Sequence, residues 1–263
     1  IAQVGKAFRN EITPGNFIFR TIEFEQMEHQ WFCKEGTDQE YYAEFKKRAW
    51  QFLLNLGFKE EHLRFHDHDK LAHYAKAACD IQYDFPMGWS ELNGIHNRTD
   101  YDLSRHQEYS GKSMMYVDPV TQERYIPYVI EYSIGADRLM LAALSEAYDE
   151  ETLENGEVRN VMRFHPAIAA YKAAVLPLQK GLAPQAKELL AKLKKHFLVT
   201  YDEAGSIGKR YRRQDEIGTP YCLTVDFDTL ENGTVTVRDR DTMEQVRMNA
   251  DEVIAFLREK CAF

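Results

Sequence analysis

A turn signal between two β-compatible runs near the start of the chain is the feature that most constrains its fold. Residues 1–8 end in apolar Ala7 and Phe8, residues 19–28 form the second run, and Thr13-Pro14-Gly15-Asn16 separates them. Proline and glycine favour turns, and two extended runs joined by a turn predict an antiparallel pair. We therefore expect a strand–turn–strand unit within a sheet.

Charged and aromatic side chains in this unit indicate a nucleotide site. Successive side chains of a strand point to opposite faces, so Arg9 and Glu11 would share one face, and Phe24, Gln26 and Glu28 a face of the return strand. An arginine fork matches phosphate oxygens, and a phenylalanine ring offers a flat face to a base. A surface ion pair beside a core phenylalanine is the simpler alternative.

Residues 127–141 predict a strand that runs into a helix. Glu131, Ser133 and Gly135 fall on one face at period two, and a carboxylate, a hydroxyl and bare backbone suit a small zwitterion. Asp137 can cap the helix that follows. Arg138 opposes the helix dipole, which a bound nucleotide would justify, although a pair with a nearby glutamate is the alternative.

These stretches resemble the class II aminoacyl-tRNA synthetases. Arg9-Asn10-Glu11 with residues 19–28 resembles motif 2, and Gly135-Ala136-Asp137-Arg138 resembles motif 3. Between them, residues 88–95 and 97–103 narrow the resemblance to the dimeric glycyl-tRNA synthetases. Residues 208–221 resemble that family's anticodon-binding domain, so the resemblance covers nearly the whole chain.

The resemblance implies an α+β catalytic core with an antiparallel sheet, followed by a smaller α/β anticodon-binding domain with a mixed sheet. We expect the core at residues 1–150, incomplete at its N-terminus, an acidic linker at 151–163 and the second domain at 164–263. Strands alternating with helices also predict an α/β layer in the second domain. Its Asn232-Gly233 pair predicts a hairpin between two strands within residues 220–238.

The resemblance also implies the ATP site. Arg9 and Arg138 would be the catalytic residues, with Arg9 on the α-phosphate, Phe24 and Arg138 on either face of adenine, and Glu91 helping to hold the Mg²⁺ that accompanies ATP. No zinc or organic cofactor is expected. The implied ATP-binding residues are Arg9, Asn10, Glu11, Phe19, Arg20, Thr21, Ile22, Glu23, Phe24, Glu91, Leu92, Gly135, Ala136, Asp137 and Arg138.

Selection of glycine would depend on its ammonium group and on lack of room, with Glu28, Glu131 and Ser133 in the leading roles. The implied glycine-binding residues are Phe24, Glu25, Gln26, Met27, Glu28, Glu131, Tyr132, Ser133, Ile134 and Gly135. Lys209, Arg212 and Arg213 share a helical face and are the expected tRNA contacts, although a solvated face is the alternative.

Composition limits the partners. A net charge of −9 argues against a general nucleic-acid coat, so a tRNA partner requires local basic patches. The four cysteines include no Cys-x-x-Cys pair, and neighbours around His66 and His68 would alternate faces, so no zinc site is indicated. No apolar run approaches the roughly 20 residues of a membrane span, and we expect a cytoplasmic protein.

The expected reaction joins glycine and ATP into glycyl-adenylate and then transfers glycine to tRNA(Gly). The complete protein is expected to be a homodimer; motif 1 and part of the glycine pocket are expected upstream of Ile1, so that an isolated fragment could be inactive. One alternative is a non-catalytic accessory protein like the synthetase-like subunits of mitochondrial DNA polymerase. Another is a synthetase for a different amino acid. Retention of Arg9, Glu11, Phe24 and Arg138 disfavours the first.

Overall fold

The computed structural model describes residues 1–263 and divides into two units, Ile1–Ser145 and Glu146–Phe263. None of its helices is long and apolar enough to cross a membrane. The elements of the first part of the chain are β1 (Ala2–Phe8), β2 (Glu23–Cys33), α1 (Asp38–Asn55), the 3-10 helix η1 (Glu60–His62), β3 (Leu63–Asp67), β4 (Ala77–Phe85), β5 (Gly88–Thr99), α2 (Tyr101–Ser110), β6 (Tyr116–Val117), β7 (Arg124–Tyr125), β8 (Tyr128–Gly135) and α3 (Ala136–Ala147).

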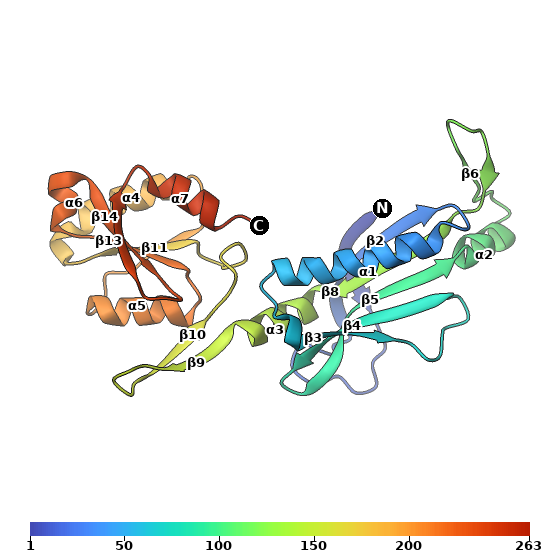
Figure 1. Ribbon diagram of the computed structural model, residues 1–263, viewed down its shortest axis with the longest axis horizontal. Helices are drawn as coiled ribbons and strands as arrows, with labels where there is room; N and C mark the ends of the chain where they lie inside the picture. Colours follow the sequence, from blue (N-terminus) through green and yellow to red (C-terminus); the bar gives the residue numbers. More distant parts are fainter. The chain divides into compact units, whose positions relative to one another are not determined.

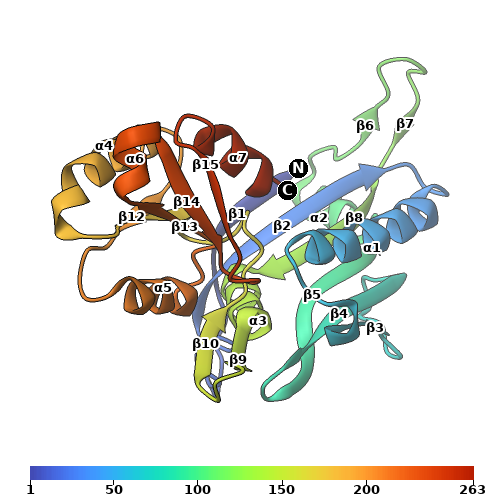
Figure 2. The same cartoon turned by 60° about the vertical axis from the view of Figure 1, so that its left-hand side comes forward.

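A six-stranded antiparallel sheet forms the first unit, in the order β1-β2-β8-β5-β4-β3. Figure 1 shows α1 lying along this sheet, and Figure 2 shows the β6–β7 hairpin projecting beyond it. Tyr42, Ala49 and Leu53 of α1 recur at helical spacing and are buried against Ile95 and Ile130 of the sheet. One face of the sheet is therefore core, and the other is left for polar side chains.

The predicted antiparallel pair at the start of the chain is present, as β1 and β2, but its second strand begins later than predicted. β2 begins at Glu23 and runs to Cys33, whereas residues 9–22 form a loop with a single bridge between Gly15 and Arg20. Pro14 lacks an N–H, and Asn16 and Phe17 have positive φ angles of 55° and 57°, so the chain cannot stay extended there. Arg9 and Glu11 consequently lie on this loop and not on a strand face.

The second unit contains β9 (Tyr148–Thr152), β10 (Val158–Met162), β11 (Ala173–Pro177), η2 (Lys180–Leu182), α4 (Ala183–Leu193), β12 (Val199–Tyr201), α5 (Ile207–Glu216), β13 (Tyr221–Val225), α6 (Phe227–Asn232), β14 (Thr234–Asp239), β15 (Gln245–Asn249) and α7 (Val253–Lys260). Its sheet, in the order β12-β11-β13-β14-β15, is mixed: β12, β11 and β13 are parallel, and the other pairs antiparallel. The α+β core and mixed-sheet fold class are thus confirmed.

Two layers of helices cover this sheet. Leu189 of α4 and Leu257 of α7 pack with Val175 and Leu223 on one face. On the other, Tyr211 of α5 packs near Leu176. Figure 2 shows α5 on the opposite side of the strands from α4 and α7.

The predicted Asn-Gly hairpin between β13 and β14 is wrong. Those strands do pair antiparallel, but α6 connects them, and Gly233 ends this helix in the left-handed region with φ 65°. Asp226 and Thr229 form a capping box at the start of α6. The capping box starts a helix here, and the Asn-Gly pair ends that helix instead of forming a hairpin turn. Both roles need a residue in the left-handed region, which glycine adopts readily.

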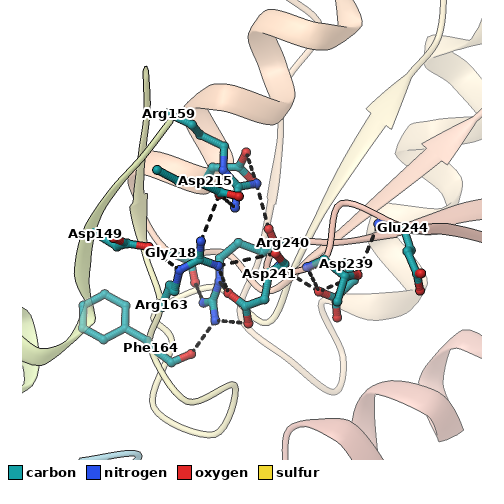
Figure 3. A network of polar contacts seen from close by, with 12 residues as sticks. Asp149, Arg159, Arg163, Phe164, Asp215, Gly218, Asp239, Arg240, Asp241 and Glu244 are labelled. Atoms are coloured by element: carbon teal, nitrogen blue, oxygen red, sulfur yellow. Dashed lines mark hydrogen bonds and ion pairs between the residues drawn. The ribbon is translucent and has the colours of Figure 1, made fainter. Parts of the chain in front are cut away.

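The segment predicted as a linker, residues 151–163, contains most of the β9–β10 hairpin, and the division at Ser145 falls before residue 150. Charged side chains attach this hairpin to the rest of the second unit (Figure 3). Arg159 of β10 lies 3.4 Å from Asp215 of α5 and donates to the carbonyl of Arg240 at 2.9 Å. Arg163 bonds to both Asp149 and Asp241.

Gly218 marks the closest approach in this cluster. Its φ of +79° is left-handed, and a Cβ there would lie 2.5 Å from Phe164 Cδ2 and 2.9 Å from the Met162 carbonyl oxygen. Arg240 donates to the carbonyls of both Gly218 and Phe164, at 2.9 and 2.8 Å. The hairpin and the helix-to-strand turn are therefore in contact with no room for a side chain.

Candidate active site

The open face of the first unit's sheet contains a pocket of about 560 Å³, open solvent included. Three stretches that are distant in sequence contribute to it: the loop after β1 with the start of β2, the middle of β5, and the end of β8 with α3. The lining residues are Arg9, Glu11, Ile18, Phe19, Arg20, Thr21, Phe24, Gln26, Glu91, Leu92, Ser133, Gly135, Asp137 and Arg138. Apart from Ile18, each is among the residues predicted from the sequence.

Two arginines in the pocket lie over aromatic rings. The Arg9 guanidinium lies 5.4 Å from the centre of the Phe24 ring, and that of Arg138 lies 4.2 Å from the Phe19 ring. Arg138 also donates to the carbonyls of Phe19 and Glu91, at 3.1 and 3.0 Å. Cation–π contacts orient both guanidiniums, and flat surfaces of the kind that bind a base are present.

Carboxylates hold two of the pocket's arginines loosely. Glu11 lies 3.4 Å from Arg20, and Glu91 lies 3.4 Å from Arg138. The side chains of Arg20 and Glu91 are each 52% exposed. In each pair the contact is long and one partner is half exposed, so the pair contributes little to stability and can open to a ligand. Glu91 is one of three carboxylates that line the pocket, with Glu11 and Asp137. Mg²⁺ is commonly bound by one or two carboxylates together with phosphates.

Asp137 acts differently from the prediction that it caps a helix. α3 follows β8 directly, with Ala136 as its first residue, so Asp137 lies inside the first turn. Its Oδ2 instead accepts the backbone N–H of Glu25 at 3.2 Å. Asp137 thereby connects the motif 3-like turn with the start of β2.

The strand register brings the predicted amino-acid residues together beside the pocket. Glu28 pairs with Ser133, which pairs on its other side with Gly94. Gln26 donates to the Ser133 Oγ at 2.5 Å. Burial raises the pKa of the Glu28 carboxyl, and the negative charge of Glu131 raises it further, against the opposing effects of Arg98 and Arg9.

The pKa of the Glu131 carboxyl is shifted in the opposite direction, downward. Burial raises the pKa of its carboxyl, but hydrogen bonds from His96 and Gln30 and the charge of Arg98 outweigh that effect and lower it to about 2. The sequence reasoning did not identify His96, Arg98 or Gln30. These residues alternate with core residues along β5 and β2, which indicates that they lie on the polar face of the sheet. That they meet at Glu131 follows only when the strand register is known.

Several predicted residues do not line the pocket. Met27, Tyr132 and Ile134 alternate onto the core face of the sheet, and Glu23 forms an ion pair with Lys6 on the edge strand β1. The other predicted residues outside the lining are Asn10, Ile22, Glu25, Glu28, Glu131 and Ala136. The period of two between strand residues explains the positions of Met27, Tyr132 and Ile134. Glu28 and Glu131 share the face of Gln26 and Ser133 but do not reach the pocket lining.

Ion pairs already engage most of the predicted tRNA patch on α5. Arg213 donates to Asp202, at 2.8 Å from its Nε, and to the carbonyl of Ala204 at 2.6 Å. Arg212 lies 3.6 Å from buried Asp215. Lys209 is the exposed cation of the three. The patch therefore offers less free positive charge than its sequence suggests.

Comparison with models of protein families identifies the family to which the chain belongs. The model of the tRNA synthetase class II core domain (G, H, P, S and T) matches residues 1–147. The chain belongs to the class II tRNA synthetases. The anticodon binding domain matches residues 172–260, so the second unit of this synthetase carries the expected second domain.

Among curated proteins, this class II synthetase is similar to glycine–tRNA ligases. It is 62% identical to that of Clostridium kluyveri over 265 residues, covering 100% of this chain and 57% of the relative. Identity to the Clostridium perfringens ligase is 62% over 269 residues, and to that of Geobacillus kaustophilus 61% over 265, covering 100% of this chain and 58% of each relative. The chain thus spans less than two thirds of these relatives.

Proposed function

We propose that the protein is a glycine–tRNA ligase that joins glycine to tRNA(Gly) through a glycyl-adenylate. The observation that carries the proposal is the convergence of Arg9, Phe24, Glu91, Ser133 and Arg138, from three distant stretches, on one pocket. Similarity to curated glycine–tRNA ligases supports the same activity.

Catalysis in this proposal consists of alignment and charge stabilisation, because the glycine carboxylate is itself the nucleophile toward the α-phosphorus. Arg9 holds the α-phosphate and the glycine carboxylate, and Arg20 reaches the terminal phosphates. Arg138 and Phe24 hold adenine, with Phe19 as a further ring that the structure places against Arg138. Glu91 faces the Mg²⁺ that enters with ATP.

The amino-acid end of the pocket supports selection of glycine. The register places the Glu28 carboxylate and the Ser133 hydroxyl on strands beside Gly94, and such groups suit an ammonium group. In this proposal, lack of room excludes amino acids with a side chain. Crowding can discriminate against alanine more strongly than the roughly 1–3 kcal/mol typical of a pocket that merely misses one methylene, because overlap is repulsive.

Glycine-dependent ATP–pyrophosphate exchange tests the proposal, with the protein expressed at the length that its gene encodes. We expect exchange with glycine but not with alanine or serine, and its loss in Arg9→Ala at an unchanged melting temperature. Absence of exchange with any amino acid would refute the adenylate step and favour a non-catalytic accessory protein. A second assay, which measures the attachment of glycine to tRNA(Gly), tests the transfer step separately.

The same proposal includes a homodimer of the complete protein and a place in the cytoplasm, both taken from the family. Sedimentation velocity measures the first directly. A monomer that still catalyses exchange would remove the dimer from the proposal and leave the chemistry intact.

A further inference from the structure

Glu131 accepts hydrogen bonds from its own chain on both oxygens. Its Oε1 receives His96 Nδ1 at 3.1 Å and Arg98 Nη1 at 3.2 Å, and its Oε2 receives Gln30 Nε2 at 2.9 Å and Arg98 Nη1 at 3.1 Å. A carboxylate has about four in-plane acceptor positions. Three groups of the protein itself, from His96, Gln30 and Arg98, thus make two contacts with each oxygen of Glu131.

Arg98 holds Glu131 from a fixed position. Its Nε donates to Asp102 of α2 at 2.7 Å, and its guanidinium lies 4.3 Å from the centre of the Tyr74 ring. The Arg98 side chain is only 20% exposed. A guanidinium braced by a carboxylate and a ring keeps one orientation, because its fork is planar and its partners come from different segments.

His96 is held in place by its neighbour Gly94. A Cβ on Gly94 would lie 2.8 Å from His96 Cε1, so bare backbone leaves the imidazole the space from which it faces Glu131. Gly94 also pairs with Ser133 in the next strand. The row Gln30–Glu131–His96 and the row Glu28–Ser133–Gly94 are consequently neighbours on one face of the sheet.

Glu28 offers a contrast on the same face of the sheet. It lies opposite Ser133 in β8, and its carboxyl accepts no hydrogen bond, in contrast to that of Glu131. The charges of Glu131 and Arg98 act on the Glu28 carboxyl in opposite directions. Two neighbouring carboxylates resist joint ionisation unless a cation compensates them. Arg98 supplies that compensation through its contacts with Glu131 and its charge near Glu28.

On the basis of the function proposed above, we infer that Arg98 is a positioning residue for the amino-acid subsite. Arg98 keeps Glu131 charged and in one orientation, without direct contact between Glu131 and the substrate. Glu28 and Ser133 are then the pair that binds the ammonium group of glycine. Glu131 then acts through its charge, whereas Glu28 acts by contact.

The experiment compares Arg98→Met with Arg105→Met in glycine-dependent pyrophosphate exchange, with the protein at its encoded length. Arg105 is a matched control because it also lies over a tyrosine, Tyr101, and pairs with a carboxylate, Glu108, but on the exposed side of α2. We expect Arg98→Met to raise the KM for glycine about tenfold or more while the KM for ATP changes by less than about twofold. Arg98→Lys should restore part of the glycine affinity, because it retains the charge without the fork.

An unchanged KM for glycine in folded Arg98→Met would overturn the inference, as would an equal rise in both KM values, which indicates general disruption. If Arg98→Met fails to fold, Arg98→Lys and Asp102→Asn are compared in the same way. Each should raise the KM for glycine, by less than Arg98→Met would, and leave the KM for ATP nearly unchanged. The unmutated protein separates the two proposals: without glycine-dependent exchange the proposed function fails, whereas exchange that Arg98 does not influence refutes the positioning role alone.

Discussion

Charged side chains are paired differently in the core of the second unit and in the pocket of the first unit. In the second unit, Asp215 and Arg159 have fully buried side chains, and Asp215 receives Arg238 on both oxygens at 2.8 and 3.0 Å. In the first unit's pocket, Arg20 and Glu91 are half exposed, and their ion pairs measure 3.4 Å. Paired, buried charges determine structure, and loosely paired charges facing a pocket are free to act on a ligand.

The physical reason is desolvation. A charge buried away from water costs several kcal/mol, so the fold retains it only with its partners in place. A half-exposed charge keeps most of its hydration and can exchange that water for a phosphate or carboxylate at small cost. The following variants test this difference, from the largest expected effect to the smallest.

Asp215→Ala should cause the largest loss of stability, because it leaves Arg238 buried without its carboxylate and removes one of the two carboxylates that pair with buried Arg159. We expect the free energy of unfolding of the second unit to fall by about 3–5 kcal/mol in chemical denaturation. Glu108→Ala, which removes an exposed acid paired with Arg105, is the control and should have little effect. Equal losses in the two variants would contradict the distinction.

Arg138→Ala should show the reverse pattern, with a large loss of activity and a small loss of stability. Its guanidinium is aimed at the pocket, so we expect pyrophosphate exchange to fall about 100-fold. Arg48→Ala, on the exposed side of α1 and paired with Glu44, controls for loss of a surface arginine. A drop in melting temperature that accounts for the lost activity would assign Arg138 a structural role.

Glu131→Gln should remove a pH dependence of stability. The folded-state pKa of Glu131 is lowered to about 2 from an ordinary 4.5, so its stabilisation is complete above about pH 4.5 and is lost as the pH falls toward 2. We expect the unmutated protein to be more stable than the variant by about 3 kcal/mol at neutral pH. That difference should shrink across this window in urea denaturation, and a constant difference would disprove the linkage.

Lys209→Ala should have the smallest effect, a reduction of tRNA affinity by about threefold and a lower salt slope. Arg213→Ala is the informative comparison, because Arg213 already binds Asp202 and Ala204. We expect it to influence affinity less than Lys209→Ala does and the melting temperature more. Filter binding at two salt concentrations measures both affinities, and identical behaviour of the two variants would count against the assignment.

The sequence could predict which residues meet in the pocket better than how they meet. The residues in the motif-like stretches were identified by their resemblance to the family's motifs. The loop from Arg9 to Ile22 brings its residues to the pocket without the strand face that the spacing suggested for Arg9 and Glu11. Loop conformation depends on positive φ angles at Asn16 and Phe17, residues for which that geometry is uncommon. Spacing alone cannot anticipate it.

Partners across the sheet were beyond the sequence for a different reason. Nothing in the order of residues reveals that Gln30, His96 and Arg98 converge on Glu131, because that depends on the register of three strands. Likewise, Arg213 and Asp202 are separated by a turn, and only the fold shows that their charges cancel. Charge patterns on one helix therefore overestimated the basic surface of α5.

The central position of β8 has a consequence for how the protein is made. Gln26 and Ser133, which are bonded across β2 and β8, lie 107 positions apart in the chain. During synthesis, β1–β2 and β3–β4–β5 can form earlier as separate pieces, but only the insertion of β8 between β2 and β5 joins them. We therefore expect the nascent chain to hold two incomplete halves of the pocket until residue 138 has left the ribosome, and binding competence to arise in one late step.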